Sequence, residues 1–428
     1  MDLIKTREKP LRRPRNLFYL VMALLAVVGL TYVVLSVAPA SRASPVEPAP
    51  EGSLARSTTG DMYLLAHRAD GLNSLLRLNT GTGQVEPIYE TYPGSVMART
   101  GDGRSVYVYD QSRPVPQGSL VRVNSQDGPT GWEVKVAWFP FVGPPDQGLW
   151  LSSDEKRIYL LGAQADDYHL NIYSVDTAAG ALAGEFNLEL PYSIRVVSSY
   201  PRLWKIPWAE AVVVASGDQL FTFDLLSGNS GTPVTIFSPE DLKRVPRNMS
   251  LGLYVTDGDW GRQSQRLYLA TSSQEILSVD FTSEPYTVDT VFSLPPGWQF
   301  AGWGHLLVDA SQAVAYVQVK RDDSPVNAGL EVDEILQLEM AQWTQVAAFN
   351  LREHTTSPED YNGQLEPGRA AGPQGFGLAL SPDGQQVFAL MQRGTLSFSR
   401  DQGARDQGRF TRIHWGDIPE PLWYSVVP

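Results

Sequence analysis

Residues 106–110 read VYVYD, and a run of the same kind returns six more times along the chain. The other copies are MYLLA (62–66), IYLLG (158–162), VVVAS (212–216), LYLAT (267–271), AYVQV (315–319) and VFALM (387–391). An aromatic or β-branched residue holds the second place of each copy, which favours a β-strand. Successive copies lie 44 to 72 residues apart, and a spacing near fifty residues is typical of four-stranded repeats. Seven copies therefore predict an all-β, seven-bladed β-propeller.

A second run follows most copies and ends in a polar or acidic residue, as in LLRLN (75–79) and LFTFD (220–224). Turns rich in Thr, Gly and Ser come after several of these runs, and they accept the positive φ angles that tight hairpins need. A Ser-Pro-Asp-Gly turn (381–384) stands before the last copy. These turns predict that neighbouring strands are joined as antiparallel hairpins.

The segment LALSPDGQQVFAL (378–390), followed by a strand that ends near an acidic residue, resembles the repeats of the YVTN and WD40-like β-propeller superfamily. Proteins of this superfamily occur in many bacterial envelopes. The resemblance covers about residues 58–428, and it implies a fold and no particular subfamily.

Closure of the ring is also predicted from the sequence. Apolar runs precede the repeated strand in the later blades, for example GLWLSS (148–153), SLGLYVT (250–256) and FGLALS (376–381), and we expect them to form innermost strands. Before Tyr63 there is only the polar stalk, so blade one lacks an innermost strand of its own. The run LWYSVV (422–427) resembles GLWLSS, so we expect it to complete blade one and remove the exposed edges of the ring.

The first 57 residues predict a membrane anchor. Residues 17–38 form an uncharged stretch of 22 residues, which as a helix spans roughly 33 Å and can cross a bilayer once. The basic segment 1–16 should stay in the cytoplasm. Residues 39–57, rich in Pro and Ser, then form a stalk that places the propeller (58–428) outside, in the periplasm or at the cell surface. The alternative is a cleaved signal peptide, because Ala38-Pro39-Ala40 fits a cleavage site.

Charge and cysteine content exclude several classes of function. The net charge is −13, and residues 41–428 carry 28 basic and 45 acidic groups. Nucleic acid is therefore not an expected partner, since phosphate neutralisation needs clustered Lys and Arg. The chain has no Cys. Disulfides, thiolate metal sites and cysteine nucleophiles are excluded, and a cysteine-free ectodomain indicates a bacterial envelope protein.

No catalytic, cofactor or metal residue can be assigned from the sequence. The five histidines are scattered singly, without the spacing that pairs two ligands on one face, and each is interpreted as a surface or strand residue. Asp257-Gly258-Asp259-Trp260-Gly261 begins like a calcium loop, but the twelfth position is Tyr268, where an EF-hand requires Glu. We interpret this segment as an inter-strand turn.

A long insertion at residues 191–209 is the candidate binding surface. Its aromatic and basic side chains would suit a carbohydrate or peptide. They are Tyr192, Arg195, Tyr200, Arg202, Trp204, Lys205 and Trp208. The alternative is that part of the insertion is an irregular first strand of blade four, with its aromatic side chains in the core between blades.

Three hypotheses of function follow. The first, which the lack of a catalytic set favours, is a membrane-anchored binding or scaffolding module for a protein, peptide or glycan in the envelope. The second is an enzyme, a lyase or hydrolase, with its site in the central channel, since propellers host many chemistries. The third is a structural subunit of a larger membrane complex.

Overall fold

The chain divides into two compact units, residues 1–55 and 56–428. The structure, a computed structural model, describes residues 61–427. The gaps are 69–70, 93–94, 111–116, 125–127, 138–147, 164–167, 192–200, 238–252, 262–263, 283–284, 302–304, 310, 322–331, 352–374, 382, 392, 402–407 and 419–420. Within this part of the chain no helix is long and apolar enough to cross a bilayer. The predicted span at 17–38 and the stalk lie outside the described residues.

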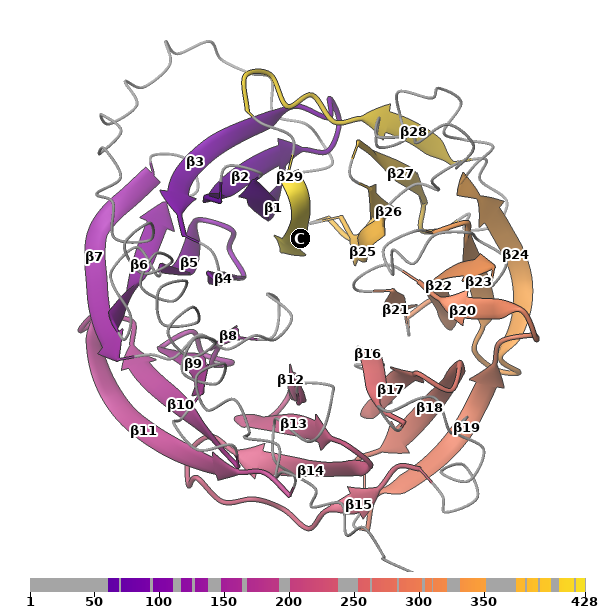
Figure 1. Ribbon diagram of the computed structural model, residues 1–428, viewed down its shortest axis with the longest axis horizontal. Coiled ribbons are helices and arrows are strands. Elements are labelled where there is room, and N and C mark those ends of the chain that lie inside the picture. Colours follow the sequence, from indigo (N-terminus) through magenta and orange to yellow (C-terminus); the bar gives the residue numbers. More distant parts are fainter. Residues whose placement is uncertain are drawn as a thin grey trace, which may run out of the picture. The chain divides into compact units, whose positions relative to one another are not determined.

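The strands form seven antiparallel sheets arranged around a ring (Figure 1). From the innermost strand outward, blade 1 contains β29 (Pro421–Val427), β1 (Asp61–Arg68), β2 (Asn73–Asn79) and β3 (Val85–Thr91). Blade 2 contains β4 (Val96–Arg99), β5 (Ser105–Asp110), β6 (Gln117–Asn124) and β7 (Gly128–Ala137). Blade 3 contains β8 (Leu149–Leu151), β9 (Arg157–Ala163), β10 (His169–Asp176) and β11 (Ala181–Glu189). Blade 4 contains β12 (Arg202–Lys205), β13 (Ala211–Ser216), β14 (Gln219–Asp224) and β15 (Val234–Thr235).

Blade 5 contains β16 (Val255–Gly261), β17 (Arg266–Thr271), β18 (Glu275–Asp280) and β19 (Thr287–Ser293). Blade 6 begins with two short strands, β20 (Trp298–Phe300) and β21 (Leu306–Asp309), which both pair with β22 (Val314–Arg321). It continues with β23 (Glu334–Glu339) and β24 (Thr344–Asn350). Blade 7 contains β25 (Gly375–Leu380), β26 (Gln386–Met391), β27 (Gly394–Ser399) and β28 (Arg409–Arg412). The prediction of a seven-bladed β-propeller is confirmed.

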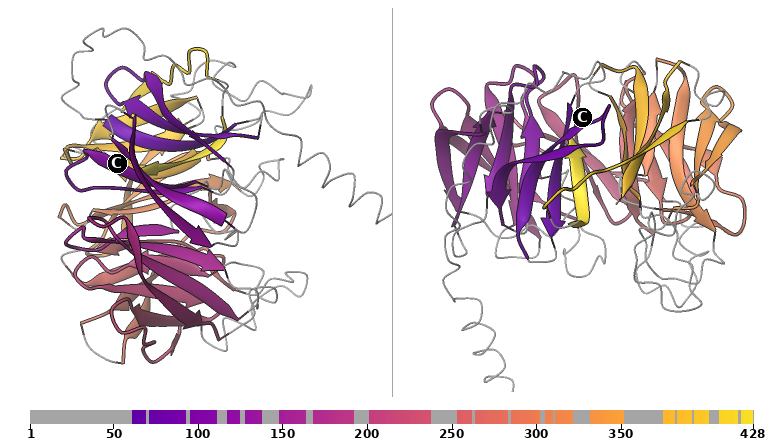
Figure 2. Two further views of the ribbon diagram at one scale, coloured as in Figure 1. Left: turned by 90° about the vertical axis from the view of Figure 1, so that its left-hand side faces the viewer. Right: turned by 90° about the horizontal axis from the view of Figure 1, so that it is seen from above.

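The repeated run of the sequence is the second strand of every blade. Its aromatic or β-branched residue is at most 6% exposed in all seven copies. These residues are Tyr63, Tyr107, Tyr159, Val213, Tyr268, Tyr316 and Phe388. Both faces of each second strand pack against neighbouring blades, so the core lies between the sheets and the side view shows them stacked around the ring (Figure 2).

The polar residue that ends many third strands has a definite structural role. Asp224 Oδ1 accepts hydrogen bonds from the backbone N–H of Leu226 (2.8 Å) and Ser227 (2.7 Å). Asn79, Asp176 and Glu339 bond in the same way to the turns that follow them. The bond from Ser227 N–H, above all, lowers the pKa of Asp224. The acid therefore organises the hairpin that leads to the outermost strand.

A second kind of turn joins the innermost strand to the second one. Ser152 Oγ donates to Asp154 at 2.7 Å and accepts from Arg157 N–H at 2.9 Å. The Ser152 bond, with that from Lys156 N–H, lowers the pKa of Asp154 to about 2. The predicted turns at 101–104 and 381–384 have the same arrangement. We call the face of the ring that carries these turns the turn face, and the opposite face the loop face.

The first sheet joins the two ends of the domain. β29 pairs with β1 in antiparallel register, from Tyr63 opposite Val427 to Arg68 opposite Pro421. It also contacts β25 of blade 7 and β4 of blade 2. The run 422–427, expected from the sequence as the innermost strand of blade one, thus corresponds to β29.

The innermost strand of blade 5 differs from its prediction. It begins at Val255, later than the run 250–256 suggested, and it contains Asp257-Gly258-Asp259. The interpretation of that segment as a turn is wrong, because Asp257 and Asp259 pair with Ala270 and Tyr268 of β17. Two carboxylates remain in this inner strand because the neighbouring blade supplies donors to them, as described below.

Candidate functional site at the inner strands of blades 4 to 6

Part of the predicted binding insertion is the innermost strand of blade 4. Arg202–Lys205 form β12, which pairs with β13. Trp204 is 8% exposed and packs in the core between blades 4 and 5, where a Cβ on Gly258 would lie 3.0 Å from its ring. For Trp204 the alternative stated above, a first strand with its aromatic side chain in the core, therefore describes the structure. Tyr192, Arg195 and Tyr200 lie outside the described residues.

The remaining predicted residues do not gather on one surface. Arg202 begins β12 at the loop face, whereas Trp208 lies in the turn after its other end. Lys205 Nζ donates to the carbonyls of Ile206 (3.1 Å) and Ala209, and it lies 3.5 Å from Glu210. Burial lowers the pKa of Lys205. Trp208 is 39% exposed and packs edge-on against Trp260, with ring centroids 4.9 Å apart.

Two carboxylates of blade 5 bind the inner edge of blade 6. Asp257 Oδ2 accepts from Leu306 N–H and Asp259 Oδ2 accepts from Val308 N–H, both at 2.8 Å. Gln318 N–H donates to His305 O at 2.9 Å, so the alternate peptide groups at 306 and 308 face away from β22, towards the ring axis. Asp257 and Asp259 are two residues apart on β16, and the N–H groups of Leu306 and Val308 are two residues apart on β21. The spacings match, so both N–H groups at the inner edge of blade 6 have an acceptor.

His305 lies beside these carboxylates. Its Nε2 is 3.0 Å from Thr256 Oγ1, and its ring is stacked on Phe300 at a centroid distance of 5.5 Å. The Thr256 hydroxyl donates its proton to Ala270 O at 3.1 Å, so its oxygen accepts from His305. Nε2 of His305 is therefore the donor of this hydrogen bond. The side chain is buried, with 5% exposed.

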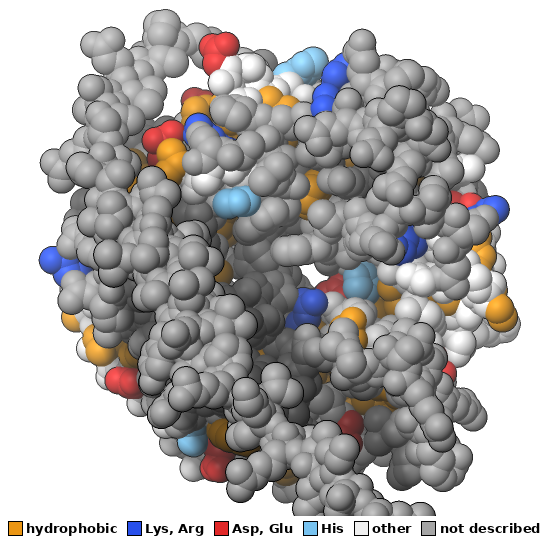
Figure 3. Space-filling view, viewed as in Figure 1, with side chains coloured by type: hydrophobic (Ala, Val, Ile, Leu, Met, Phe, Trp, Pro, Cys, Tyr) orange, Lys and Arg blue, Asp and Glu red, His pale blue; other side chains and the backbone are white. Residues whose placement is uncertain are grey.

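The inner-strand cluster of Thr256, Asp257, Asp259 and His305 is close to the ring axis. The innermost strands β12, β16, β21 and β25 contact one another in order around the ring. Figure 3 shows a narrow opening near the centre of the ring, with basic, acidic and histidine side chains at its edge. Within the described ranges no three His, Asp or Glu side chains are placed to hold a metal ion. The cluster supplies a hydrogen-bonding imidazole and carboxylates, which are groups suited to general acid–base chemistry.

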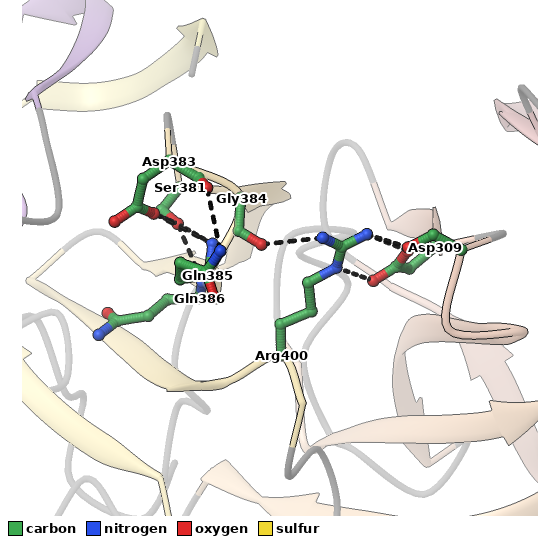
Figure 4. A network of polar contacts seen from close by, with 8 residues as sticks. Asp309, Ser381, Asp383, Gly384, Gln385, Gln386 and Arg400 are labelled. Carbon is green, nitrogen blue, oxygen red and sulfur yellow. Dashed lines mark hydrogen bonds and ion pairs between the residues drawn. The ribbon is translucent and has the colours of Figure 1, made fainter.

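An ion pair on the turn face is structural. Arg400 follows β27 of blade 7 and contacts Asp309 at the end of β21 in blade 6 (Figure 4). Its Nη2 donates to Asp309 Oδ1 at 2.7 Å, its Nε donates to Oδ2, and its Nη1 donates to Gly384 O at 3.1 Å. Burial opposes ionisation of Asp309, but the bonds from Arg400 and Ser311 outweigh it and lower the pKa of this carboxyl. The pair fastens blade 7 to blade 6.

Sequence reasoning did not find the inner-strand cluster. His305 was interpreted as an isolated histidine, and Asp257 and Asp259 as part of a turn. The only signal was their alternation, since Asp-x-Asp places both carboxylates on one side of a strand. That alternation can be interpreted only when the neighbouring blade is known to offer backbone N–H donors at the same spacing.

The seven sheets around the ring define the protein as a seven-bladed β-propeller. No protein-family model matches it, and no curated protein matches its sequence. Among solved structures it is similar to a functionally unknown protein from Desulfotomaculum acetoxidans (TM-score 0.51, 12% identity, covering 86% of this chain and 99% of that one). It is also similar to the periplasmic gluconolactonase of Pseudomonas aeruginosa (TM-score 0.50, 14% identity, covering 86% and 99%). At these identities the similarity is one of fold.

Proposed function

We propose that the protein is a hydrolase whose site lies at the inner-strand cluster of blades 5 and 6, with a sugar lactone as the class of substrate. The observation that carries the proposal is the cluster itself, a histidine held by Thr256 beside two carboxylates on innermost strands. The substrate class is suggested by the fold shared with a periplasmic gluconolactonase. This is the enzyme alternative considered in the sequence analysis.

The proposed chemistry assigns one role to His305. Water attacks the lactone carbonyl, His305 takes the proton of that water, and the ring C–O bond breaks to give the hydroxy acid. The proton then passes to the leaving alkoxide, so that one water is consumed for each lactone opened. Asp257 and Asp259 act by holding β21, and with it His305, in place.

The test is the rate of glucono-δ-lactone hydrolysis by the full chain in detergent, measured with a pH indicator against the spontaneous rate. His305→Gln should lower kcat about 10²- to 10⁴-fold, the usual contribution of a general base. His414→Gln is the matched control, because the side chain of His414 is exposed and distant in sequence from the cluster. Wild-type protein that adds nothing to the spontaneous rate refutes the hydrolase.

The cellular setting is part of the proposal. Residues 17–38 anchor the protein in the membrane with residues 1–16 in the cytoplasm and the propeller outside, because basic residues abut an uncharged span. Protease added to intact spheroplasts should then degrade the propeller. Protection of the full-length protein contradicts this orientation.

A second candidate is the binding module favoured by the sequence. The partly exposed Trp208, packed on Trp260 at the turn face, supports it, because exposed aromatic rings are suited to protein, peptide or glycan partners. Titration of glycan fragments while Trp fluorescence is followed tests it. A response in wild type that Trp208→Ala abolishes, without lactone hydrolysis, favours binding over catalysis.

A further inference from the structure

One side chain of blade 5 reaches the short strand of blade 6 that lies against His305. Gln274 belongs to the hairpin between β17 and β18, and its Oε1 accepts a hydrogen bond from Phe300 N–H at 2.7 Å. Phe300 is the last residue of β20. Its ring is stacked on the His305 ring, with centroids 5.5 Å apart and planes 12° from parallel. Gln274 is therefore connected to His305 through a single residue.

The direction of the Phe300 N–H makes it available to blade 5. Ala301 N–H donates to Gln318 O of β22, so the N–H of the preceding residue, Phe300, points away from β22. Only three residues of β20 pair with β22, from Trp298 to Phe300. The bond to Gln274 therefore ties this short strand to the neighbouring blade at the residue that contacts His305.

Gln274 has an unusual backbone conformation. Its φ angle is +66°, in the left-handed region that favours glycine. A residue with a side chain is kept in that region where the surrounding structure requires it. The amide of Gln274 is bonded at both ends, since Nε2 also donates to Ser272 O at 3.1 Å. Glycine would suit this backbone better, but it has no acceptor that could reach Phe300.

The imidazole of His305 is held by two blades in two different ways. Thr256 of blade 5 accepts from Nε2 at 3.0 Å, which fixes the far end of the ring. The χ2 torsion of histidine is broad by itself, so the stacked Phe300 ring supplies a restraint on the plane of the imidazole. A general base needs both restraints, because a misplacement of about 1 Å can lower a rate about 10²-fold.

We propose that Gln274 is a positioning residue for His305. Its bond to Phe300 N–H holds the Phe300 ring against the imidazole and thereby sets the plane of His305. Gln274 acts through Phe300 and takes no part in the proton transfer. The consequence for catalysis rests on the proposed function, in which His305 takes the proton of water, whereas the effect on the His305 ring does not.

Gln274→Gly tests this role, because it removes the acceptor and leaves a residue that adopts a positive φ without strain. Gln265→Gly is the matched control, since Gln265 also has positive φ (+51°) but is exposed and lies at the turn face of blade 5. Gln274→Glu is the conservative variant, which keeps an oxygen acceptor. Gln274→Asn is the second variant should Gln274→Gly fail to fold, because asparagine tolerates a positive φ but is one methylene shorter.

Two properties of the full chain in detergent are measured. The first is kcat for glucono-δ-lactone hydrolysis, which Gln274→Gly should lower about ten- to hundredfold with a smaller change in KM. The second is the NMR signal of the His305 ring protons, identified by its loss in His305→Gln. A stacked aromatic ring moves such signals upfield, so Gln274→Gly should move them downfield, towards their position in Phe300→Leu. Gln265→Gly should change neither property, and Gln274→Glu should change both less than Gln274→Gly.

The two measurements separate the positioning role from the proposed function. An unmoved His305 signal in Gln274→Gly, or in Gln274→Asn, overturns the positioning role whatever the rate. A signal that moves while kcat of an active enzyme stays the same also overturns it, because the reaction then does not need this orientation. Wild type that does not hydrolyse the lactone refutes the proposed function, and the His305 signal still decides whether Gln274 positions the ring.

Discussion

Arg400→Met should be among the most destabilising single substitutions in the ring. Asp309 retains only 2% of its side-chain exposure and Arg400 retains 21%, so the pair is largely shielded from water. Removing one partner of a buried pair leaves an uncompensated charge and costs about 3–5 kcal/mol. That is a large share of the ~5–15 kcal/mol stability of a typical domain. The variant also loses the bond to Gly384 O, which fixes the turn of blade 7.

The assay is urea denaturation followed by tryptophan fluorescence, with a double-mutant cycle. Arg400→Met combined with Asp309→Asn should be less destabilised than Arg400→Met alone, because no buried charge remains in the double variant. A cost of less than about 1 kcal/mol for Arg400→Met, as measured for exposed pairs, would refute the reasoning.

The ion pair of Arg400 and Asp309 should make the free energy of unfolding depend on pH. The pKa of Asp309 is lowered in the folded protein. The stabilisation by the ionised carboxylate is therefore fully present above the unfolded pKa of about 3.9, and it is lost as the pH falls through the lower folded value. The stability difference between wild type and Arg400→Met should be constant from about pH 5 to 8 and should shrink in more acidic solution.

Three further predictions concern the inner strands and turns. Deleting residues 421–428 should lower the melting temperature and cost several kcal/mol of stability. The deletion uncovers Leu64 and Leu65, which are both 0% exposed, and burial of each side chain is worth about 1.5–3 kcal/mol. An unchanged melting temperature would contradict closure of the ring by β29. Asp257→Ala should cost about 1–3 kcal/mol in urea denaturation, because Leu306 N–H loses its acceptor, and equal midpoints would argue against that role. Gly83→Ala should lower the melting temperature more than Gly71→Ala does. Both glycines have positive φ, but a Cβ at Gly83 would lie 2.3 Å from the carbonyl oxygen of Arg412, whereas a Cβ at Gly71 would meet no atom within 4 Å.

The sequence predicts best those strands that are buried on both faces. The second strands were found because each needs an aromatic or β-branched residue in the core between blades, as Tyr159 and Tyr316 show. The turns could be anticipated where a side chain organises them, as Asp154 and Asp224 do. In both cases the physical requirement is local, so it leaves a local pattern.

The acidic part of β16 and the surroundings of His305 escaped prediction because their requirements are not local. β16 tolerates Asp257 and Asp259 only because β21 of the next blade offers donors at the same spacing. β12 was expected only as an alternative to a binding insertion, because four residues are too few for a pattern and because Trp204 is compatible with either a surface or a core. For the same reason His305 was not recognised, since its partner Thr256 is 49 residues away.

The composite first blade has a consequence for biosynthesis. Tyr63 pairs with Val427, so 364 residues separate the two partners along the chain. At about 5–20 residues per second, a ribosome needs roughly 20–70 s between making one partner and making the other. During that time β1 lacks its inner neighbour, and its unpaired edge is open to other chains. We therefore expect a holding chaperone to be needed from the appearance of blade 1 until β29 is complete.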